Sequence, residues 1–454
     1  MSLPGYAEYK DSGVAWLGKI PAHWETRWLG SIASDQGSVF IDGDWIESKD
    51  ISDEGYKYLT SGNVGEGFYK EQGLGFVSEK TFAELNCTEV LPGDILISRL
   101  NLPIARACIV PDFGCRIVTC VDNVIVRPNP NFERQYVIFM MSSKQHFANM
   151  ENLARGTTMQ RISRSTLSRV RFAFPPPQEQ TAIATFLDRE TAKIDELIAE
   201  QEKLIALLAE KRQATISHAV TKGLNPAAPM KDSGVAWLGE VPAHWEISRL
   251  KFVASVQTGI AKGKDNSGKK TIEVSYLRVA NVQDGYLALD DIAKIEIPAD
   301  ELPRYRLRPG DVLMNEGGDF DKLGRGHLWN GEIEDCIHQN HVFAVRPNAI
   351  SSEWLNRVTS SNAAQFYFMS RSKQSTNLAS ISSTNVMELP LPLPPNEEQA
   401  VIVSFLDTET TRLDTLTAEA TRGISLLKER RSALISAAVT GKIDVRHLAE
   451  AEAA

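Results

Sequence analysis

Two long stretches of the chain, 176–222 and 395–443, carry apolar residues spaced three or four positions apart. This spacing places the apolar side chains along one stripe of an α-helix, and both stretches follow prolines, which favour a helix start. Neither helix can bury such a stripe by itself, so we expect the two helices to pair as an antiparallel coiled coil. The expected core residues are Ile183, Leu187, Ile194, Leu197, Leu204, Leu208, Ile402, Leu406, Leu413, Leu416, Ile424 and Leu427.

The remainder of the chain has a different pattern, with short apolar runs such as DILIS, NVIVRP, DVLMN and HVFAVRP between Gly, Pro and Asp residues. Short runs bounded by turn residues are typical of strands, and the segments 136–149 and 352–370 have the length of helices. The pattern therefore predicts an α+β fold, with two similar α/β domains separated by the two long helices.

The two domains are copies of each other. KDSGVAWLGKIPAHWE at 10–25 recurs as KDSGVAWLGEVPAHWE at 231–246, PGD and VRPN segments follow in both copies, and PPPQEQTAIATFLDRE at 175–190 resembles PPNEEQAVIVSFLDTE at 394–409. The repeated tryptophans are expected to pack in a core or an interface, with ligand contact as the alternative. The expected divisions are an entry segment 1–22, a first domain 23–175, a long helix 176–222, a linker with the repeated entry segment 223–243, a second domain 244–394, a long helix 395–443 and a tail 444–454.

The composition is that of a globular protein with 454 residues, of which 43% are hydrophobic and 24% charged. The formal net charge of −9 argues against polyanion binding by the whole surface, but the stretches 144–174 and 244–278 are locally basic. There is no apolar run long enough for a membrane span and no secretion signal, so we expect a cytoplasmic protein without membrane contact. The five cysteines lack CxxC spacing and are expected to be reduced.

Two segments resemble chemical motifs but lack essential residues. The segment GKDNSGKK at 263–270 approaches the phosphate-binding pattern G-x-x-x-x-G-K-[ST], but Lys270 replaces the hydroxyl residue and a strand-like segment follows where a helix is required. Cys336, His338 and His341 have the residue types of a zinc site, yet no fourth ligand is evident. Instead of binding zinc, His341 could contact a DNA base or pack against other side chains. We therefore expect no catalytic residue, no metal and no cofactor in this chain.

Residues suited to DNA occupy the loops in which the two copies diverge. Arg and Lys side chains match guanine edges, Asn and Gln match adenine edges, and polar side chains in general contact phosphates. Each candidate could instead be a phosphate contact or a solvated loop residue. The candidates are Arg99, Asn101, Arg106, Arg155, Thr157, Thr158, Gln160 and Arg161 in the first copy, and Lys262, Lys264, Lys269, Asn315, Lys322, Arg325, Lys373, Gln374, Ser375, Thr376 and Asn377 in the second.

Taken together, the repeated DSGVAWLG and PAHWE segments, the PGD turn and the repeated FLD helix block resemble the specificity subunits of type I restriction-modification systems. The resemblance covers nearly the whole chain. It implies two target-recognition domains, each reading one half of a bipartite, asymmetric DNA site. It also implies that the long helices set the spacing of the two halves and dock methyltransferase subunits.

The resemblance further implies the partners of the chain. These are double-stranded DNA, two DNA methyltransferase (modification) subunits that use S-adenosylmethionine to modify adenine, and restriction subunits that translocate and cut DNA with ATP and Mg. None of these cofactors is expected in this chain. The alternative is a recognition subunit of a related system in which methyltransferase and nuclease are fused in one partner.

Overall fold

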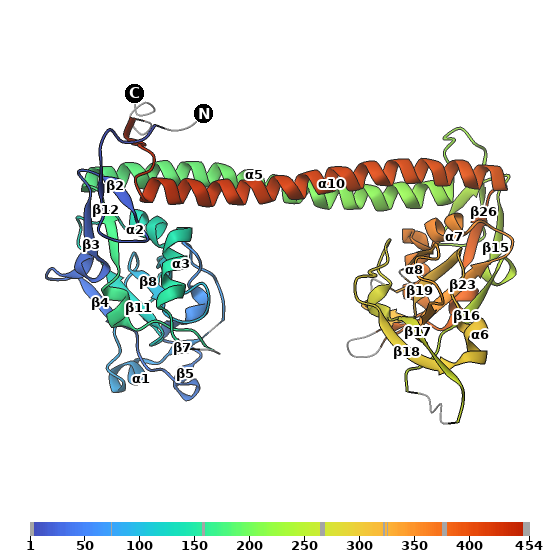
Figure 1. Cartoon of the computed structure of the whole chain (residues 1–454), viewed down its shortest axis with the longest axis horizontal. Helices are drawn as coiled ribbons and strands as arrows, with labels where there is room; N and C mark the ends of the chain where they lie inside the picture. The colour runs from blue at the N-terminus through green and yellow to red at the C-terminus, as the bar shows by residue number, and fades with distance from the viewer. Residues whose placement is uncertain are drawn as a thin grey trace. The chain divides into compact units, whose positions relative to one another are not determined.

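The computed structural model describes residues 4–73, 75–156, 159–263, 268–320, 323–324, 326–374 and 379–447. The chain forms two compact units (Figure 1). Unit 1 comprises 1–201 and 422–454, and unit 2 comprises 202–421. Each unit therefore holds one copy of the repeat together with a part of each long helix.

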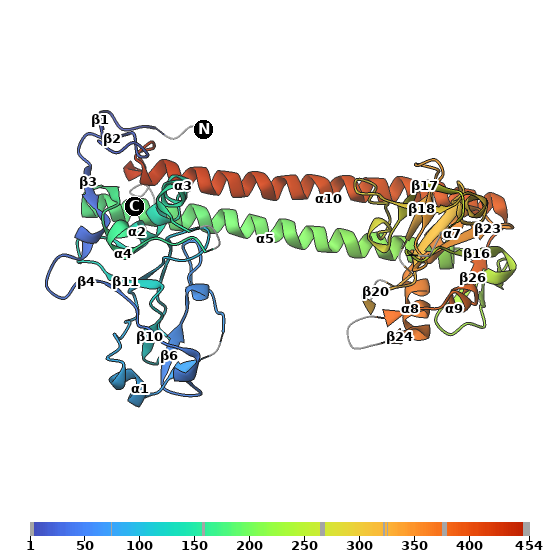
Figure 2. The same cartoon turned by 60° about the horizontal axis from the view of Figure 1, so that its bottom comes forward.

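The two long helices are α5, Pro177–Lys222, and α10, Asn396–Val439. Within each unit their segments lie side by side and antiparallel (Figure 2). In unit 1 the carboxylate of Asp195 in α5 accepts from Arg431 Nε in α10 at 2.9 Å. In unit 2 the roles are exchanged, because Arg212 Nε in α5 donates to Asp414 in α10 at 3.1 Å. The antiparallel pairing is thus present in both units.

The burial of the helix stripes corrects part of the expected core. Leu197, Leu204 and Leu416 are 46%, 41% and 37% exposed, so these three residues do not form the core. Ile198 and Ile205, which follow Ile194 at the spacing of a coiled-coil core, are half-buried instead. Thr417, four residues after Leu413, is also half-buried. The other residues are buried (Ile183, Leu187, Ile194, Leu208, Ile402, Leu406 and Leu413) or half-buried (Ile424 and Leu427).

The module of unit 1 is built on short sheets with helices against them. The strands are β1 (Tyr9–Asp11) with β2 (Lys19–Pro21), β3 (Glu25–Trp28) with β12 (Arg171–Phe174), the sheet β4 (Val39–Asp42), β11 (Asn123–Arg127), β8 (Ile95–Ser98) and β9 (Arg106–Ile109), and the sheet β10 (Ile117–Thr119), β6 (Tyr56–Leu59), β7 (Phe76–Val77) and β5 (Ile51–Ser52). The helices are α1 (Glu79–Glu84), α2 (Arg134–Met141), α3 (Lys144–Leu153) and α4 (Arg164–Ser168).

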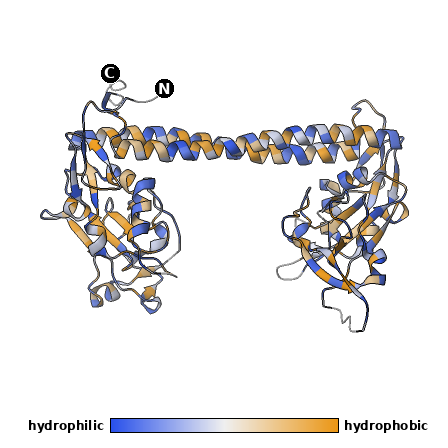
Figure 3. Cartoon of the chain, viewed as in Figure 1, coloured by the Kyte–Doolittle hydropathy of each residue, from blue (hydrophilic) through white to orange (hydrophobic). Residues whose placement is uncertain are grey.

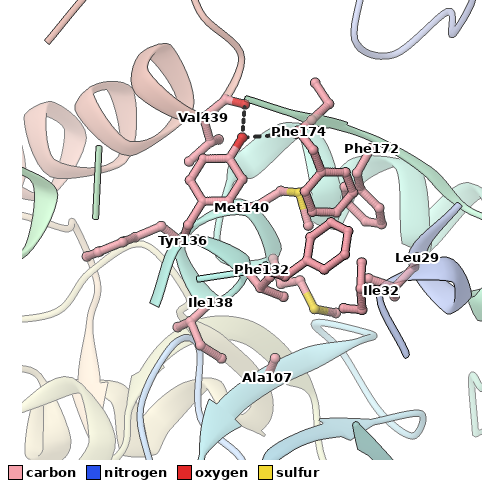
Figure 4. Close-up of a cluster of buried hydrophobic side chains, with 14 of the residues drawn as sticks. Leu29, Ile32, Ala107, Phe132, Tyr136, Ile138, Met140, Phe172, Phe174 and Val439 are labelled. Carbon is pink, nitrogen blue, oxygen red and sulfur yellow. Dashed lines mark hydrogen bonds between the residues drawn. The ribbon is translucent and has the colours of Figure 1, made fainter. Parts of the chain in front are cut away.

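The core of unit 1 joins this module to both long helices. Figure 4 shows the buried cluster around Tyr136 of α2, whose hydroxyl donates to Ala173 O of β12 at 2.9 Å and lies 3.5 Å from Val439 O of α10. Ile183 and Leu187 of α5 belong to the same cluster. Apolar residues are concentrated on the central strands of the module, whereas polar and apolar residues alternate along the helices (Figure 3).

The module of unit 2 repeats this arrangement. Its strands are β13 (Met230–Asp232) with β14 (Glu240–Pro242), β15 (Glu246–Arg249) with β26 (Pro390–Leu393), the sheet β16 (Ala254–Thr258), β23 (Val342–Pro347), β19 (Asp311–Asn315) and β21 (Gly326–Trp329), the sheet β18 (Ala293–Pro298), β17 (Thr271–Leu277) and β22 (Ile337–His338), and the sheet β20 (Gly317–Gly318), β25 (Ala379–Ser380) and β24 (Lys373–Gln374). The helices are α6 (Leu302–Tyr305), α7 (Ser352–Thr359), α8 (Asn362–Arg371) and α9 (Ser383–Met387).

The repeated PGD and VRP segments hold each other in place. Asp94, which is 1% exposed, accepts two hydrogen bonds from the Arg127 guanidinium at 2.8 and 2.7 Å. In unit 2, Asp311 accepts two from Arg346, both at 2.7 Å. A buried carboxylate requires such a bidentate partner, which explains why both segments occur in each copy.

The end of a long helix packs on the repeated entry segment in each unit. Gly441 follows α10 with a φ of 70°, and a Cβ at this position would lie 2.3 Å from Pro21 and 3.4 Å from the Trp24 ring. Gly223 follows α5 with a φ of 71°, and a Cβ there would lie 3.2 Å from Trp245. Glycine both ends the helix and allows the close approach. Both tryptophans are fully buried, so the packing interpretation applies to them.

Candidate DNA interface

In unit 1 the structure brings together two loops that are far apart in the sequence. The loop after β8 pairs with the segment 155–161: Asn101 N donates to Gln160 O at 3.1 Å, and Ile162 N donates to Arg99 O at 3.0 Å. Arg155 and Arg161 exchange backbone hydrogen bonds of 3.0 and 2.9 Å, so these two residues pair with each other. The described candidates of the two loops therefore lie together in what we call the unit 1 loop cluster: Arg99, Asn101, Arg155, Gln160 and Arg161.

The exposed side chains of this cluster are available for a ligand. Arg155 and Asn101 are exposed, and Asn101 adopts the left-handed conformation with a φ of 61°. The Arg161 side chain is 55% exposed, with Nη2 at 3.2 Å from Asp122 Oδ1. Gln160 is half-buried, and its Oε1 has no hydrogen-bond partner in the described part of the chain.

Two other arginines of the first copy support the loops instead of facing outward. Arg99 is 6% exposed, and its Nε lies 3.3 Å from Asp42 Oδ1. Arg106 Nε donates to Val64 O at 3.0 Å, and its Nη1 donates to Asn101 O at 3.1 Å. Burial lowers the pKa of the Arg106 guanidinium. Arg99 Nη2 also donates to Val121 O. Both side chains thus satisfy carbonyls of the loops, and we therefore assign them to loop support.

Unit 2 has an equivalent surface, the unit 2 loop cluster, on the sheet of β20, β25 and β24. Ile381 N donates to Glu316 O at 2.8 Å, as Ile162 N does to Arg99 O in unit 1. Lys373 and Gln374 in β24 are exposed. Asn315 is 1% exposed and donates to Val282 O at 2.8 Å, so this candidate also has a supporting position.

Two candidate lysines of the basic loop in the second copy, Lys262 and Lys269, are exposed. The start of this loop is attached to the segment before β23, because Ile260 O accepts from Asn340 N at 3.2 Å. Lys262 lies two residues after Ile260. The Lys269 side chain is 55% exposed, with Nζ at 3.9 Å from Glu301 Oε1. The remaining candidates lie outside the described residues: Thr157, Thr158, Lys264, Lys322, Arg325, Ser375, Thr376 and Asn377.

In the two segments that resemble chemical motifs, the described residues are arranged differently from such sites. A strand, β17, follows the GKDNSGKK segment, so the helix that a phosphate loop requires does not follow it. Nδ1 of His338 lies 2.7 Å from Val342 O, and burial lowers the pKa of this imidazole to about 4. Among the described residues no group of three or more His, Cys, Asp or Glu side chains is arranged for a metal ion.

The family model for the type I restriction modification DNA specificity domain matches residues 21–206 and 242–424. These matches cover most of the chain, with one match in each copy of the repeat. The chain belongs to the type I restriction-modification DNA specificity family. As a specificity subunit the chain recognises DNA and is not itself catalytic. The alternative, a recognition subunit of a related system in which methyltransferase and nuclease are fused in one partner, is not favoured.

Several specificity subunits of this family are similar in sequence. The StySPI specificity subunit of Salmonella potsdam is 22% identical over 440 residues, which are 95% of this chain and 92% of that subunit. The EcoKI specificity subunit of Escherichia coli K12 is 23% identical over 72% of this chain and 69% of its own length.

Solved structures share the fold. A chain from a study of assembly and conformational transition in a type I restriction-modification system has a TM-score of 0.69 at 16% identity, over 92% of this chain and 98% of that chain. The HsdS subunit of Thermoanaerobacter tengcongensis has a TM-score of 0.53 at 16% identity, over 93% and 98%. In the described part of the specificity subunit, no helix is both long and apolar enough to span a bilayer.

Proposed function

We propose that each module reads one half of a bipartite, asymmetric DNA sequence through its loop cluster. The observation that supports this most directly is the equivalence of the two clusters. Matching backbone hydrogen bonds join Arg99 to Ile162 in unit 1 and Glu316 to Ile381 in unit 2, whereas the exposed side chains around them differ. A shared scaffold with different exposed side chains is suited to reading two different sequences.

The proposed contacts are the exposed members of the two clusters and the half-buried Gln160. In unit 1 these are Asn101, Arg155, Gln160 and Arg161, and in unit 2 they are Lys373 and Gln374 together with Lys262 and Lys269 of the basic loop. Guanidinium and ammonium groups suit guanine edges or phosphates, and amides suit adenine edges. The candidates outside the described residues stay predictions.

We further propose that α5 and α10 set the separation of the two half-sites and dock methyltransferase subunits. Leucines on both helices remain exposed beside the pairing stripe, which supports a docking role: Leu197 and Leu426 in unit 1 are 46% and 56% exposed, and Leu204, Leu207 and Leu416 in unit 2 are 41%, 51% and 37% exposed. Exposed apolar side chains on a helix fit an apolar face of a partner protein.

The proposed partners supply the chemistry. Two modification subunits would bind S-adenosylmethionine and methylate adenine, and restriction subunits would use ATP and Mg to translocate and cut DNA. The proposed location of the assembly is the cytoplasm, where its DNA substrate lies.

The experiment that tests this function is co-expression of the chain with its cognate methyltransferase subunit, followed by single-molecule mapping of methylated adenines. We expect one motif in two halves with a fixed spacer. A continuous motif, or methylation that does not depend on this chain, would reject the proposal.

A further inference from the structure

Glu316 and His341 lie side by side in the unit 2 loop cluster, although they are 25 residues apart in the sequence. Glu316 follows β19 and His341 precedes β23, and Glu316 N donates to His341 O at 2.9 Å. Oε2 of Glu316 lies 2.6 Å from Nδ1 of His341. The imidazole side chain is 57% exposed and the carboxylate side chain 29%, so both are accessible to a ligand.

This contact fixes the tautomer of the imidazole. An ionised carboxylate only accepts hydrogen bonds, so Nδ1 of His341 carries the hydrogen and donates it to Glu316. Nε2 of a neutral imidazole then carries one lone pair and is an acceptor. In the structure Asn340 Nδ2, 3.2 Å away, donates to this lone pair. The pair therefore presents an acceptor atom on the surface of the cluster, and a base amino group would take the place of Asn340 there.

In unit 1 the side chain exposed at the matching place is a donor that comes from a neighbouring segment of the loop cluster. Arg99 N donates to Asp122 O at 2.8 Å, as Glu316 N does to His341 O, so Asp122 is the counterpart of His341. There the carboxylate of Asp122 lies 3.2 Å from Nη2 of Arg161, whose side chain is 55% exposed. One place in the scaffold thus presents a guanidinium in unit 1 and an imidazole acceptor in unit 2.

We propose that His341, oriented by Glu316, is a specificity-determining residue of the second module and accepts a hydrogen bond from an exocyclic amino group, adenine N6 or cytosine N4. In the major groove these amino groups are the donors that a base presents, whereas guanine and thymine present acceptors. This inference rests on the proposed function, because it requires that the unit 2 loop cluster contacts base edges.

The test is selection of bound sequences from a random duplex pool by the complex of the full chain with its methyltransferase subunits. For His341→Ala we expect the preference for A or C at one position of one half-site to fall about tenfold, with the other half-site unchanged. The matched control is Arg161→Ala in unit 1, which should change the other half-site only.

Glu316→Gln separates reading from a structural role. The amide of glutamine can either accept from Nδ1 of His341 or donate to it, so it no longer holds the imidazole in one tautomer, and Nε2 becomes an acceptor or a donor. We expect the preference for A or C at this position to relax, so that G and T are also selected. A merely structural carboxylate would instead weaken binding without changing the base preference.

The results that would overturn the inference are distinct from a failure of the proposed function. If the wild-type complex selects a bipartite sequence and His341→Ala and Glu316→Gln select the same one, His341 does not read a base. Weaker assembly with the methyltransferase and an unchanged sequence would show that His341 contacts protein instead, which also overturns it. A wild-type complex that selects no bipartite sequence would reject the proposed function itself.

Discussion

The indole Nε1 of Trp24 donates a 2.9 Å hydrogen bond to Oε1 of Glu179, which joins the entry segment of unit 1 to the first turn of α5. The same carboxylate accepts from the Tyr6 hydroxyl at 2.6 Å and lies 2.7 Å from His23 Nε2. Burial and this carboxylate raise the pKa of Tyr6, so the phenol remains a donor. In unit 2, Glu398 lies 2.7 Å from His244 Nε2, whereas Trp245 Nε1 has no hydrogen-bond partner in the described part of the chain.

This difference predicts unequal effects of one substitution in the two units. Glu179→Ala leaves two buried donors without an acceptor and should reduce local stability by about 2–4 kcal/mol. Glu398→Ala removes a contact to a half-exposed histidine and should cost about 1 kcal/mol or less. Hydrogen exchange of the backbone at 20–28 and at 241–249 measures the two effects in one protein, and equal losses would contradict the prediction.

The PGD segment allows a test of its buried ion pair. Arg127→Ala leaves the carboxylate of Asp94 buried without its partner, and we expect a loss of about 3–5 kcal/mol in the free energy of unfolding. The double variant Asp94→Ala with Arg127→Ala removes both charges and should lose less than the sum of the single variants. A double-mutant cycle by denaturant unfolding measures the coupling. Additive losses would mean that the pair does not stabilise the fold.

Two buried histidines predict a loss of stability in acid. Burial lowers the pKa of His146 and of His338 from 6.5 to about 4. The unfolded chain takes up a proton as the pH falls through 6.5, but the folded chain does so only near 4, so acid favours unfolding. At pH 5 each histidine should reduce the free energy of unfolding by about 2 kcal/mol relative to pH 7.5.

The matched variant His146→Asn removes one of these groups. Hydrogen exchange at pH 5 and pH 7.5 should then show a smaller pH dependence in unit 1 and an unchanged one in unit 2. An unchanged pH dependence in unit 1 would contradict the assignment to His146.

The sequence predicted elements better than it predicted side-chain positions. The spacing of apolar residues was sufficient to predict the long helices and their pairing. It did not distinguish Leu197 from Ile198 as the core residue, because the apolar stripe covers more of the helix surface than the part that meets the partner helix. Arg99 and Asn315 were chosen as polar loop residues, yet turns leave carbonyls that such side chains satisfy, here Val121 O and Val282 O. Glu316 and His341 were not recognised as a pair because only the folded strands bring them together.

The proposed role of the helices in spacing predicts the effect of an insertion. Seven residues added to each of α5 and α10 between the modules preserve the apolar stripe and lengthen each helix by about 10 Å, so the spacer should grow by about three base pairs. Mapping of methylated adenines in cells measures the spacer. An active variant with an unchanged spacer would show that the helices do not set it.

The most direct test of the central claim is an exchange of residues 30–173 for the matching segment of another specificity subunit, with the methylated motif mapped before and after. Our account predicts that one half of the motif changes while the other half and the spacer stay the same. A change in both halves, or in neither, would contradict the claim that each module reads its own half-site.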